Sequence, residues 1–173
     1  KKNRPIGEGL FDINRWTWRR KKKYWKNPLN IITPSDWMKQ NVKKSYLMKR
    51  WPVYSIPNAI DIKKWKPVDK NLSRKTLKLP NELSLILYGS TSGTKDYHKG
   101  FDLLEKSLEK LQNINKKIGL VIFGEDEPKI KPNFKFPIFY LGFLQNSKSL
   151  ITAYSAVDLV LIPSRVESFG QVA

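Results

Sequence analysis

Cysteine is absent from this chain of 173 residues, and histidine occurs once, as His98. Without cysteine there can be no disulfide, no thiolate catalysis and no cysteine-ligated metal. One histidine in a polar loop does not support a Ser-His-Asp triad either. No apolar run approaches the ~18 residues that a transmembrane helix requires, and the basic start leads into no apolar signal segment. We therefore expect a cytoplasmic globular protein, a class that a content of 40% hydrophobic residues also suits.

Acidic residues are scarce in the first part of the chain. Residues 1–75 hold 21 Lys and Arg against 5 Asp and Glu, whereas residues 76–173 hold 12 against 10. Residues 1–27 interleave the cations with aromatic rings, including Trp18 and Trp25. Such a segment suits an anionic membrane surface or nucleic acid, and an amphipathic helix packed on a core is a third interpretation. Between a membrane surface and nucleic acid, we expect the membrane, through a peripheral contact of residues 1–50.

Apolar runs and helical patterns alternate along most of the chain. Strands are predicted at residues 29–33, 53–56, 83–88, 120–124, 138–142 and 159–162. Helices are predicted at residues 36–44, 73–79, 99–113 and 150–156. This order predicts an α/β fold with a Rossmann-like parallel sheet and flanking helices.

Two stretches place polar groups at the carboxyl ends of predicted strands. After Pro163 and Ser164, a loop carries Glu167, and a helix is predicted from about Gly170. A ligand site is typical of such a position, because helix N-termini favour phosphate. The loop at residues 90–98 is small and polar, so its N–H groups could cradle phosphate, although an ordinary surface loop is the alternative. Lys99 follows it at a predicted helix start, where a cation opposes the helix dipole unless it binds an anion.

The text "AYSAVDLVLIPSRVESFGQVA" resembles the retaining glycosyltransferases of family 4 (group 1), which have the GT-B fold. Their signature is an aspartate, an apolar strand, Pro-Ser, Glu-x-Phe-Gly and a second Glu eight residues after the first. Glu167 is the first Glu, and the second would fall two residues beyond Ala173. The stretch "IPNAID" resembles the family's crossing between lobes. By this resemblance residues 1–57 end the N-terminal, acceptor-side lobe, and residues 58–173 are a truncated C-terminal lobe that binds nucleotide sugar.

The resemblance also implies roles for individual residues. In the family, the residue matching Glu167 contacts the donor sugar and the one matching Lys99 binds the donor diphosphate; these two are the expected catalytic residues. An Arg is common where Ser90 stands, so the usual pair of cations is incomplete. Gly142-Phe143-Leu144 resembles the family's Gly-aromatic-Leu stretch, which lies near the nucleotide base. A role of these residues in core and turn packing is an equal alternative. The remaining residues expected to bind the donor are Gly89, Ser90, Phe143, Leu144, Phe169, Gly170 and Gln171.

The resemblance implies a hexosyltransferase-like enzyme of polysaccharide or lipopolysaccharide biosynthesis. It would transfer a sugar, with retention, from a nucleotide-diphosphate sugar to a sugar or lipid-linked acceptor, at the inner face of the plasma membrane. GT-B enzymes generally need no metal, so we expect neither metal nor cofactor. We expect this fragment alone to be inactive. The alternative is a non-enzymatic basic module that binds an anionic membrane surface or nucleic acid.

Overall fold

The computed structural model describes residues 12–90, 93–111, 117–129, 132 and 134–171. The chain divides into two compact units, Lys1–Asn58 and Ala59–Ala173. The division falls beside the turn residues of the "IPNAID" stretch, where the sequence places the boundary between two lobes. The assignment of these lobes to acceptor and donor remains a prediction.

The first unit is a small strand–helix–strand arrangement preceded by a helix. Its elements are α1 (Ile13–Tyr24), β1 (Ile31–Thr33), α2 (Asp36–Lys44) and β2 (Val53–Ser55). Strands β1 and β2 are parallel, and Ile31 lies opposite Val53. The Ser35 side chain accepts a hydrogen bond from the Met38 N–H (3.2 Å), so it caps α2 as the sequence predicts. Among the described residues of this unit, only Thr33 and Val53 are buried.

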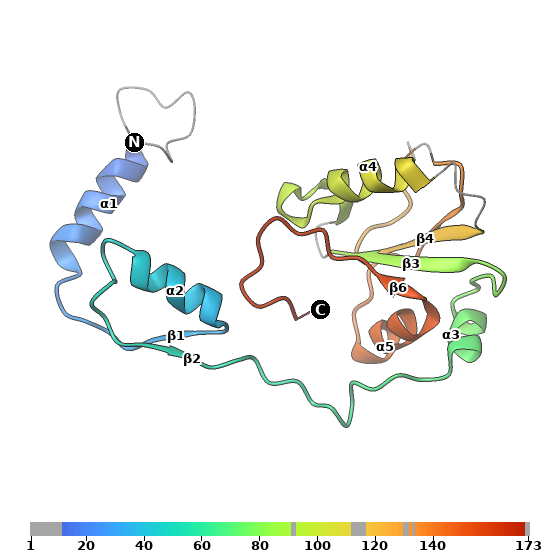
Figure 1. The fold of residues 1–173 in the computed structure, drawn as a ribbon, viewed down its shortest axis with the longest axis horizontal. Coiled ribbons are helices and arrows are strands. Elements are labelled where there is room, and N and C mark those ends of the chain that lie inside the picture. Colours follow the sequence, from blue (N-terminus) through green and yellow to red (C-terminus); the bar gives the residue numbers. More distant parts are fainter. Residues whose placement is uncertain (1–11, 91–92, 112–116, 130–131, 133, 172–173) are drawn as a thin grey trace. The chain divides into compact units, whose positions relative to one another are not determined.

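The second unit is an α/β layer structure. Its helices are α3 (Lys70–Thr76), α4 (Phe101–Leu111) and α5 (Ser147–Ala156), with two short 3-10 turns, η1 (Gly93–Lys95) and η2 (Tyr97–Lys99). Its strands are β3 (Ser84–Gly89), β4 (Ile118–Phe123), β5 (Ile138–Tyr140) and β6 (Leu159–Val160). They form one parallel sheet in the order β5-β4-β3-β6. In Figure 1, α4 covers one face of this sheet, and α3 and α5 lie on the other side. The predicted Rossmann-like parallel sheet with flanking helices is thus confirmed.

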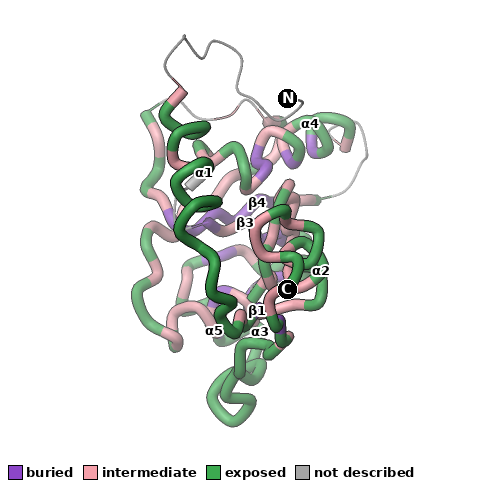
Figure 2. Tube along the Cα trace, turned by 90° about the vertical axis from the view of Figure 1, so that its left-hand side faces the viewer, coloured by how far each residue is buried: buried purple, intermediate pink, exposed green. Residues whose placement is uncertain are grey.

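The core of this unit occupies both faces of the sheet, because consecutive strand residues point to opposite sides. Leu85 and Leu87 of β3 pack with Val121 on the α5 side. Ile86 and Tyr88 pack with three residues on the inner face of α4, Phe101, Leu104 and Leu108. Figure 2 shows this burial concentrated on β3 and β4. The continuous apolar character of these strands is what a sheet buried on both faces requires.

The boundaries of three helices differ from the sequence prediction, in two of them because of capping. Helix α3 begins at Lys70, since Asp69 accepts a hydrogen bond from the Leu72 N–H (2.7 Å). Helix α5 begins at Ser147, since Asn146 caps it. Helix α4 begins only at Phe101. The predicted end of that helix, at residues 112–113, lies outside the described residues.

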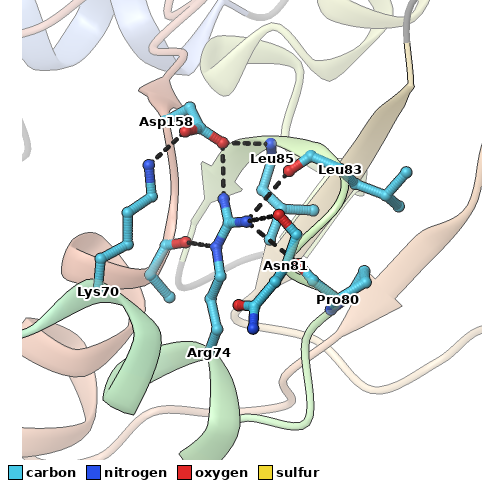
Figure 3. Close-up of polar contacts among 8 residues, drawn as sticks. Lys70, Arg74, Pro80, Asn81, Leu83, Leu85 and Asp158 are labelled. Carbon is cyan, nitrogen blue, oxygen red and sulfur yellow. Dashed lines mark hydrogen bonds and ion pairs between the residues drawn. The ribbon is translucent and has the colours of Figure 1, made fainter.

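A buried cation ties α3 to the sheet (Figure 3). Arg74 is only 4% exposed, and its guanidinium donates to the Asp158 carboxylate at 2.7 Å. Asp158 also accepts from the Leu85 N–H (2.7 Å) and pairs with Lys70. The remaining N–H groups of Arg74 donate to the backbone carbonyls of Pro80, Asn81, Leu83 and Ala156. This network fixes the start of β6 beside β3, which in turn sets the direction of the loop that follows β6.

Candidate active site

The carboxyl ends of the parallel strands in the second unit lie together at one edge of the sheet. The Ser90 N–H, just after β3, donates to the Phe123 carbonyl at 3.3 Å. The Gly124 N–H, just after β4, donates to the Gly142 carbonyl at 2.8 Å. Ligands of open α/β sheets bind outside this kind of edge. The predicted donor residues Gly89 and Ser90 are therefore at the expected place in the fold.

Lys99 and Glu167, which are 68 residues apart, meet at this edge. Lys99 Nζ lies 2.7 Å from Glu167 Oε1, and each side chain is 32% exposed. The pKa of Glu167 is lowered, first by the hydrogen bond from Lys99 and then by one from Ser164. Glu167 is thus a carboxylate at neutral pH that accepts hydrogen bonds and remains accessible to a ligand.

Lys99 does not open the following helix, so that part of the sequence prediction is wrong. It is the last residue of η2, and Gly100 follows it with φ +69°. A left-handed residue cannot belong to the right-handed α4, which therefore starts one residue later, at Phe101. Lys99 still lies just before the N-terminal end of α4, where the Gly100 carbonyl accepts hydrogen bonds from the Leu103 and Leu104 N–H groups, so the helix dipole still opposes its charge. The Lys99 ammonium is neutralised by the ion pair with Glu167.

The loop after β6 is bound to the segment around Lys99 by a second ion pair, which the sequence prediction missed. The Arg165 guanidinium donates two hydrogen bonds to the Asp102 carboxylate, at 2.8 and 2.6 Å. Arg165 lies two residues before Glu167, and Asp102 lies three residues after Lys99. No sequence pattern connects the two residues, because the contact depends on β6 lying next to β3.

The loop predicted to cradle phosphate has part of its backbone already engaged. The Thr94 N–H and hydroxyl both donate to Glu125 Oε2, at 3.0 and 3.2 Å. The Thr94 amide is therefore satisfied by protein. Residues 91 and 92 of this loop lie outside the described residues. Glu125 belongs to the acidic turn after β4, so this turn has a structural role in holding the loop.

A cavity of about 730 Å³ opens beside the same edge, on the α5 face of the sheet. Three predicted donor residues, Phe143, Leu144 and Gln171, line it. Its other aromatic walls are Trp65, Phe123 and Tyr154, which the sequence prediction missed; the only signal for Trp65 is an aromatic residue in a polar connector. The remaining lining residues are Ala59, Ile60, Asp61, Gly124, Gln145 and Leu150. Its size and mostly apolar walls with few polar groups are typical of small-molecule sites.

The segment from Glu167 to Gln171 joins the ion pair to the cavity, but it does not begin a helix at Gly170. Gly170 has φ +73°, which is outside the right-handed helical region, and Gln171 lies in a turn. Residues 172 and 173 lie outside the described residues. Along the chain, Phe169 and Gly170 lie between Glu167 and Gln171, which lines the cavity. Because the predicted helix from about Gly170 would run through residues 172 and 173, it stays a prediction.

Two features are absent from the described ranges. No helix there combines the length and the apolarity needed to span a bilayer. No three His, Asp or Glu side chains gather there in an arrangement that could hold a metal ion.

The parallel sheet with a ligand-sized cavity at its carboxyl edge defines a Rossmann-like α/β fold. The solved structure of sucrose-phosphate synthase (tll1590) from Thermosynechococcus elongatus matches 97% of this chain, with a TM-score of 0.66 and 21% identity, and the match covers 43% of that chain. Glycogen synthase from Chlorobium chlorochromatii (strain CaD3) is 29% identical over 156 residues, which cover 76% of this chain and 31% of that protein. No protein-family model matches.

The structural similarity assigns the chain the GT-B fold. The chain spans less than half the length of each of the two relatives.

Proposed function

We propose that the complete protein is a retaining glycosyltransferase of family 4, with hexosyltransferase-like activity. It transfers a sugar from a nucleotide-diphosphate sugar to a sugar or lipid-linked acceptor. The observation that carries the proposal is the Lys99–Glu167 pair, 2.7 Å apart at the carboxyl edge of the sheet, next to a cavity lined by aromatic rings. A cation, a sugar-binding carboxylate and an aromatic cavity are the groups that a nucleotide sugar requires.

The donor would extend along the sheet edge in three parts. Its base occupies the cavity, where Trp65 and Phe143 are 38% and 58% exposed and offer ring faces for stacking. Its diphosphate crosses the strand ends near Ser90 and meets Lys99. Its sugar reaches Glu167, which accepts hydrogen bonds from two hydroxyl groups. A site that hydrogen-bonds hydroxyls discriminates strongly against sugars that lack them.

Lys99 and Glu167 neutralise each other before a donor binds. When the donor enters, Lys99 turns to the diphosphate and Glu167 to the sugar, so each charge exchanges one partner for another. Cations aimed at a leaving diphosphate stabilise the charge that develops there. In the proposed reaction, Lys99 and backbone N–H groups neutralise the leaving diphosphate, without a metal ion or a cofactor.

Donor binding tests this proposal directly on the 173-residue chain. UDP-glucose, ADP-glucose and GDP-mannose are titrated by calorimetry, together with the free nucleoside diphosphates. We expect Lys99→Ala to weaken both nucleoside diphosphate and nucleotide sugar about tenfold, equivalent to about 1.4 kcal/mol. We expect Glu167→Gln to weaken only the nucleotide sugar. Lys110→Ala, which removes an exposed cation from α4, is the matched control.

The proposal is wrong if none of these donors binds, or if neither variant changes binding. Turnover is expected from the complete protein, and the chain of 173 residues is expected to show none. Polysaccharide or lipopolysaccharide biosynthesis at the cytoplasmic face of the plasma membrane is the proposed setting.

A second proposed activity is peripheral binding of an anionic membrane through the basic segment. Its support is α1, in which no residue is buried and Trp16 and Trp18 are 55% and 41% exposed. Arg20 and Lys22 lie over these two rings, with the cationic atom 4.9 and 5.5 Å from the respective ring centroids. Aromatic rings flanked by cations are typical of helices at an anionic interface.

Vesicle co-sedimentation separates the two proposed activities. We expect the chain to bind vesicles that contain phosphatidylglycerol and not vesicles of phosphatidylcholine. Replacing Lys21, Lys22 and Lys23 by alanine should abolish this binding. Replacing Lys63, Lys64 and Lys66, which are also exposed, removes the same charge and should leave binding nearly intact. Equal losses in both triple variants would contradict a specific role of α1, and steep salt-dependent binding of RNA instead would favour nucleic acid.

A further inference from the structure

We propose that Arg165 and Asp102 form a latch that positions Glu167 against Lys99 for donor binding. Arg165 and Asp102 are positioning residues, because they act through Glu167 and Lys99. The inference rests on the proposed function of that pair, and it adds two residues to which neither the family resemblance nor the comparisons assign a role.

The latch is built from two hydrogen bonds in parallel. Arg165 Nη1 lies 2.8 Å from Asp102 Oδ1, and Arg165 Nη2 lies 2.6 Å from Asp102 Oδ2. A planar guanidinium facing a planar carboxylate in this way fixes direction as well as distance. The hydrogen bond from Arg165 is the first cause of the lowered pKa of Asp102, and the hydrogen bond from Asp102 is the first cause of the raised pKa of Arg165.

Further contacts hold the same two segments together on the other side of Lys99. The Arg165 N–H donates to the His98 carbonyl at 2.8 Å, and Arg165 Nη1 donates to the Tyr97 carbonyl at 2.7 Å. The guanidinium also lies over the Tyr97 ring, 3.9 Å from its centroid. Arg165 is thus bound to Tyr97 and His98 before Lys99 and to Asp102 after it.

Glu167 depends on this arrangement because its own segment has no regular secondary structure. Residues 161–169 are neither helix nor strand. Only Val166 separates Arg165 from Glu167, so fixing the Arg165 backbone leaves Glu167 a small range of positions. A binding carboxylate must be held within about 0.5 Å of its productive place to be effective. The latch meets that requirement in a loop without regular secondary structure.

The exposure of the latch argues for positioning rather than for fold stability. The side chains of Arg165 and Asp102 are 22% and 45% exposed. Partly exposed ion pairs add little to the free energy of folding, because solvent screens them and ordering two side chains costs entropy. The main consequence of losing the latch is therefore expected in the site and not in the stability of the chain.

One test needs no ligand: the carboxylate of Glu167 is titrated by NMR in the 173-residue chain with carbon-13 label. Asp102→Ala is the decisive variant, because two effects on the pKa of Glu167 have opposite signs. Removing the Asp102 charge by itself would lower the pKa of Glu167. Losing the latch separates Glu167 from Lys99 and raises that pKa toward its ordinary value. We expect the rise; an unchanged or lower pKa overturns the proposal.

Binding provides the second readout. Two ratios of affinities are measured, that of UDP-glucose to UMP and that of ADP-glucose to AMP. We expect Asp102→Ala and Arg165→Ala to reduce each ratio about tenfold while the monophosphate Kd stays constant, since the base cavity is untouched. Arg165→Lys keeps the charge but not the paired hydrogen bonds, so it should recover only part of the ratio. Lys110→Ala is again the control. Equal ratios in all variants overturn the latch, whereas a wild-type chain that binds no probe sinks the proposed function and leaves the titration to decide the latch.

Discussion

Arg74 shows how one buried side chain can order several segments of this protein. Arg74 is only 4% exposed, and its guanidinium donates hydrogen bonds to four backbone carbonyls and to the Asp158 carboxylate. The fork of five N–H donors in arginine is suited to this, and a lysine could not satisfy the same set of acceptors.

We predict that Arg74→Ala lowers the free energy of unfolding by about 3–5 kcal/mol, because it leaves Asp158 and several carbonyls without their partner. Urea unfolding followed by circular dichroism measures this. Lys75→Ala, at the exposed neighbouring position, is the control and should change stability by less than about 0.5 kcal/mol. A loss for Arg74→Ala no larger than that of the control would contradict the structural role.

Asp158 makes the stability of the second unit dependent on pH. Desolvation alone would raise the pKa of Asp158, but hydrogen bonds from Lys70 and the Leu85 N–H, with the charges of Lys70 and Arg74, outweigh it and lower the pKa. A lowered pKa in the folded state means that the carboxylate stabilises the fold above the ordinary aspartate pKa of about 3.9. That contribution is lost as the pH falls below this value.

We therefore predict that Asp158→Asn is less stable than the wild type at pH 7, and that the difference narrows from about pH 4 downward. Urea unfolding at pH 7, 5 and 3 follows the change. A difference of the same size at pH 7 and pH 3 would show that the ionised form of Asp158 has no special role.

At the scale of elements, the short turn before α4 decides where Lys99 lies. Gly100 ends η2 with φ +69°, and a Cβ atom there would lie 2.2 Å from the Pro163 carbonyl oxygen. The close approach brings the segment before α4 against the segment after β6. Glycine is required here both by its backbone angle and by this neighbour.

We predict that Gly100→Ala destabilises the protein by at least about 1 kcal/mol, from the left-handed backbone alone. The contact with Pro163 must also open, so nucleotide-sugar affinity should fall together with stability. Thermal unfolding and calorimetric titration measure the two effects. Ser107→Ala, an exposed position of α4, should change neither, and wild-type affinity in Gly100→Ala would show that this contact does not shape the site.

Secondary structure was largely predictable from sequence because apolar periodicity is local. Helix α2 has the predicted bounds, and strands β3, β4, β5 and β6 overlap the predicted runs. The errors lie at ends, where one side chain such as Asp69 or Asn146 caps a helix. At Gly100 the helix prediction failed because this residue has a positive φ, which the helical pattern around it does not reveal.

At the scale of the whole molecule, the core is unequally divided between the two units. Of the buried hydrophobic residues described, Val53 is in the first unit, and the others belong to the second. Both core clusters, on the two faces of the sheet, are also in the second unit. Burying so little apolar surface supplies the first unit with little free energy to offset the entropy cost of ordering its backbone.

We predict that residues 59–173 alone unfold cooperatively on heating, with a melting temperature within a few degrees of the whole chain. Residues 1–58 alone should show no cooperative transition. Calorimetry of the two segments checks this, and nucleotide-sugar binding should remain with residues 59–173. A cooperative transition in residues 1–58, or an unfolded second segment, would contradict the division.

The sequence by itself determined the order of strands and helices, the basic character of the first part, and the choice of Lys99 and Glu167 as candidates. These follow from periodicity, composition and motif, which neighbouring residues carry. Only the tertiary structure decided that Lys99 and Glu167 touch, that Arg165 binds Asp102, and that Trp65 shares a cavity with Phe143. Those contacts join residues more than 60 positions apart, and they exist because parallel strands bring all their carboxyl ends to one edge of a sheet.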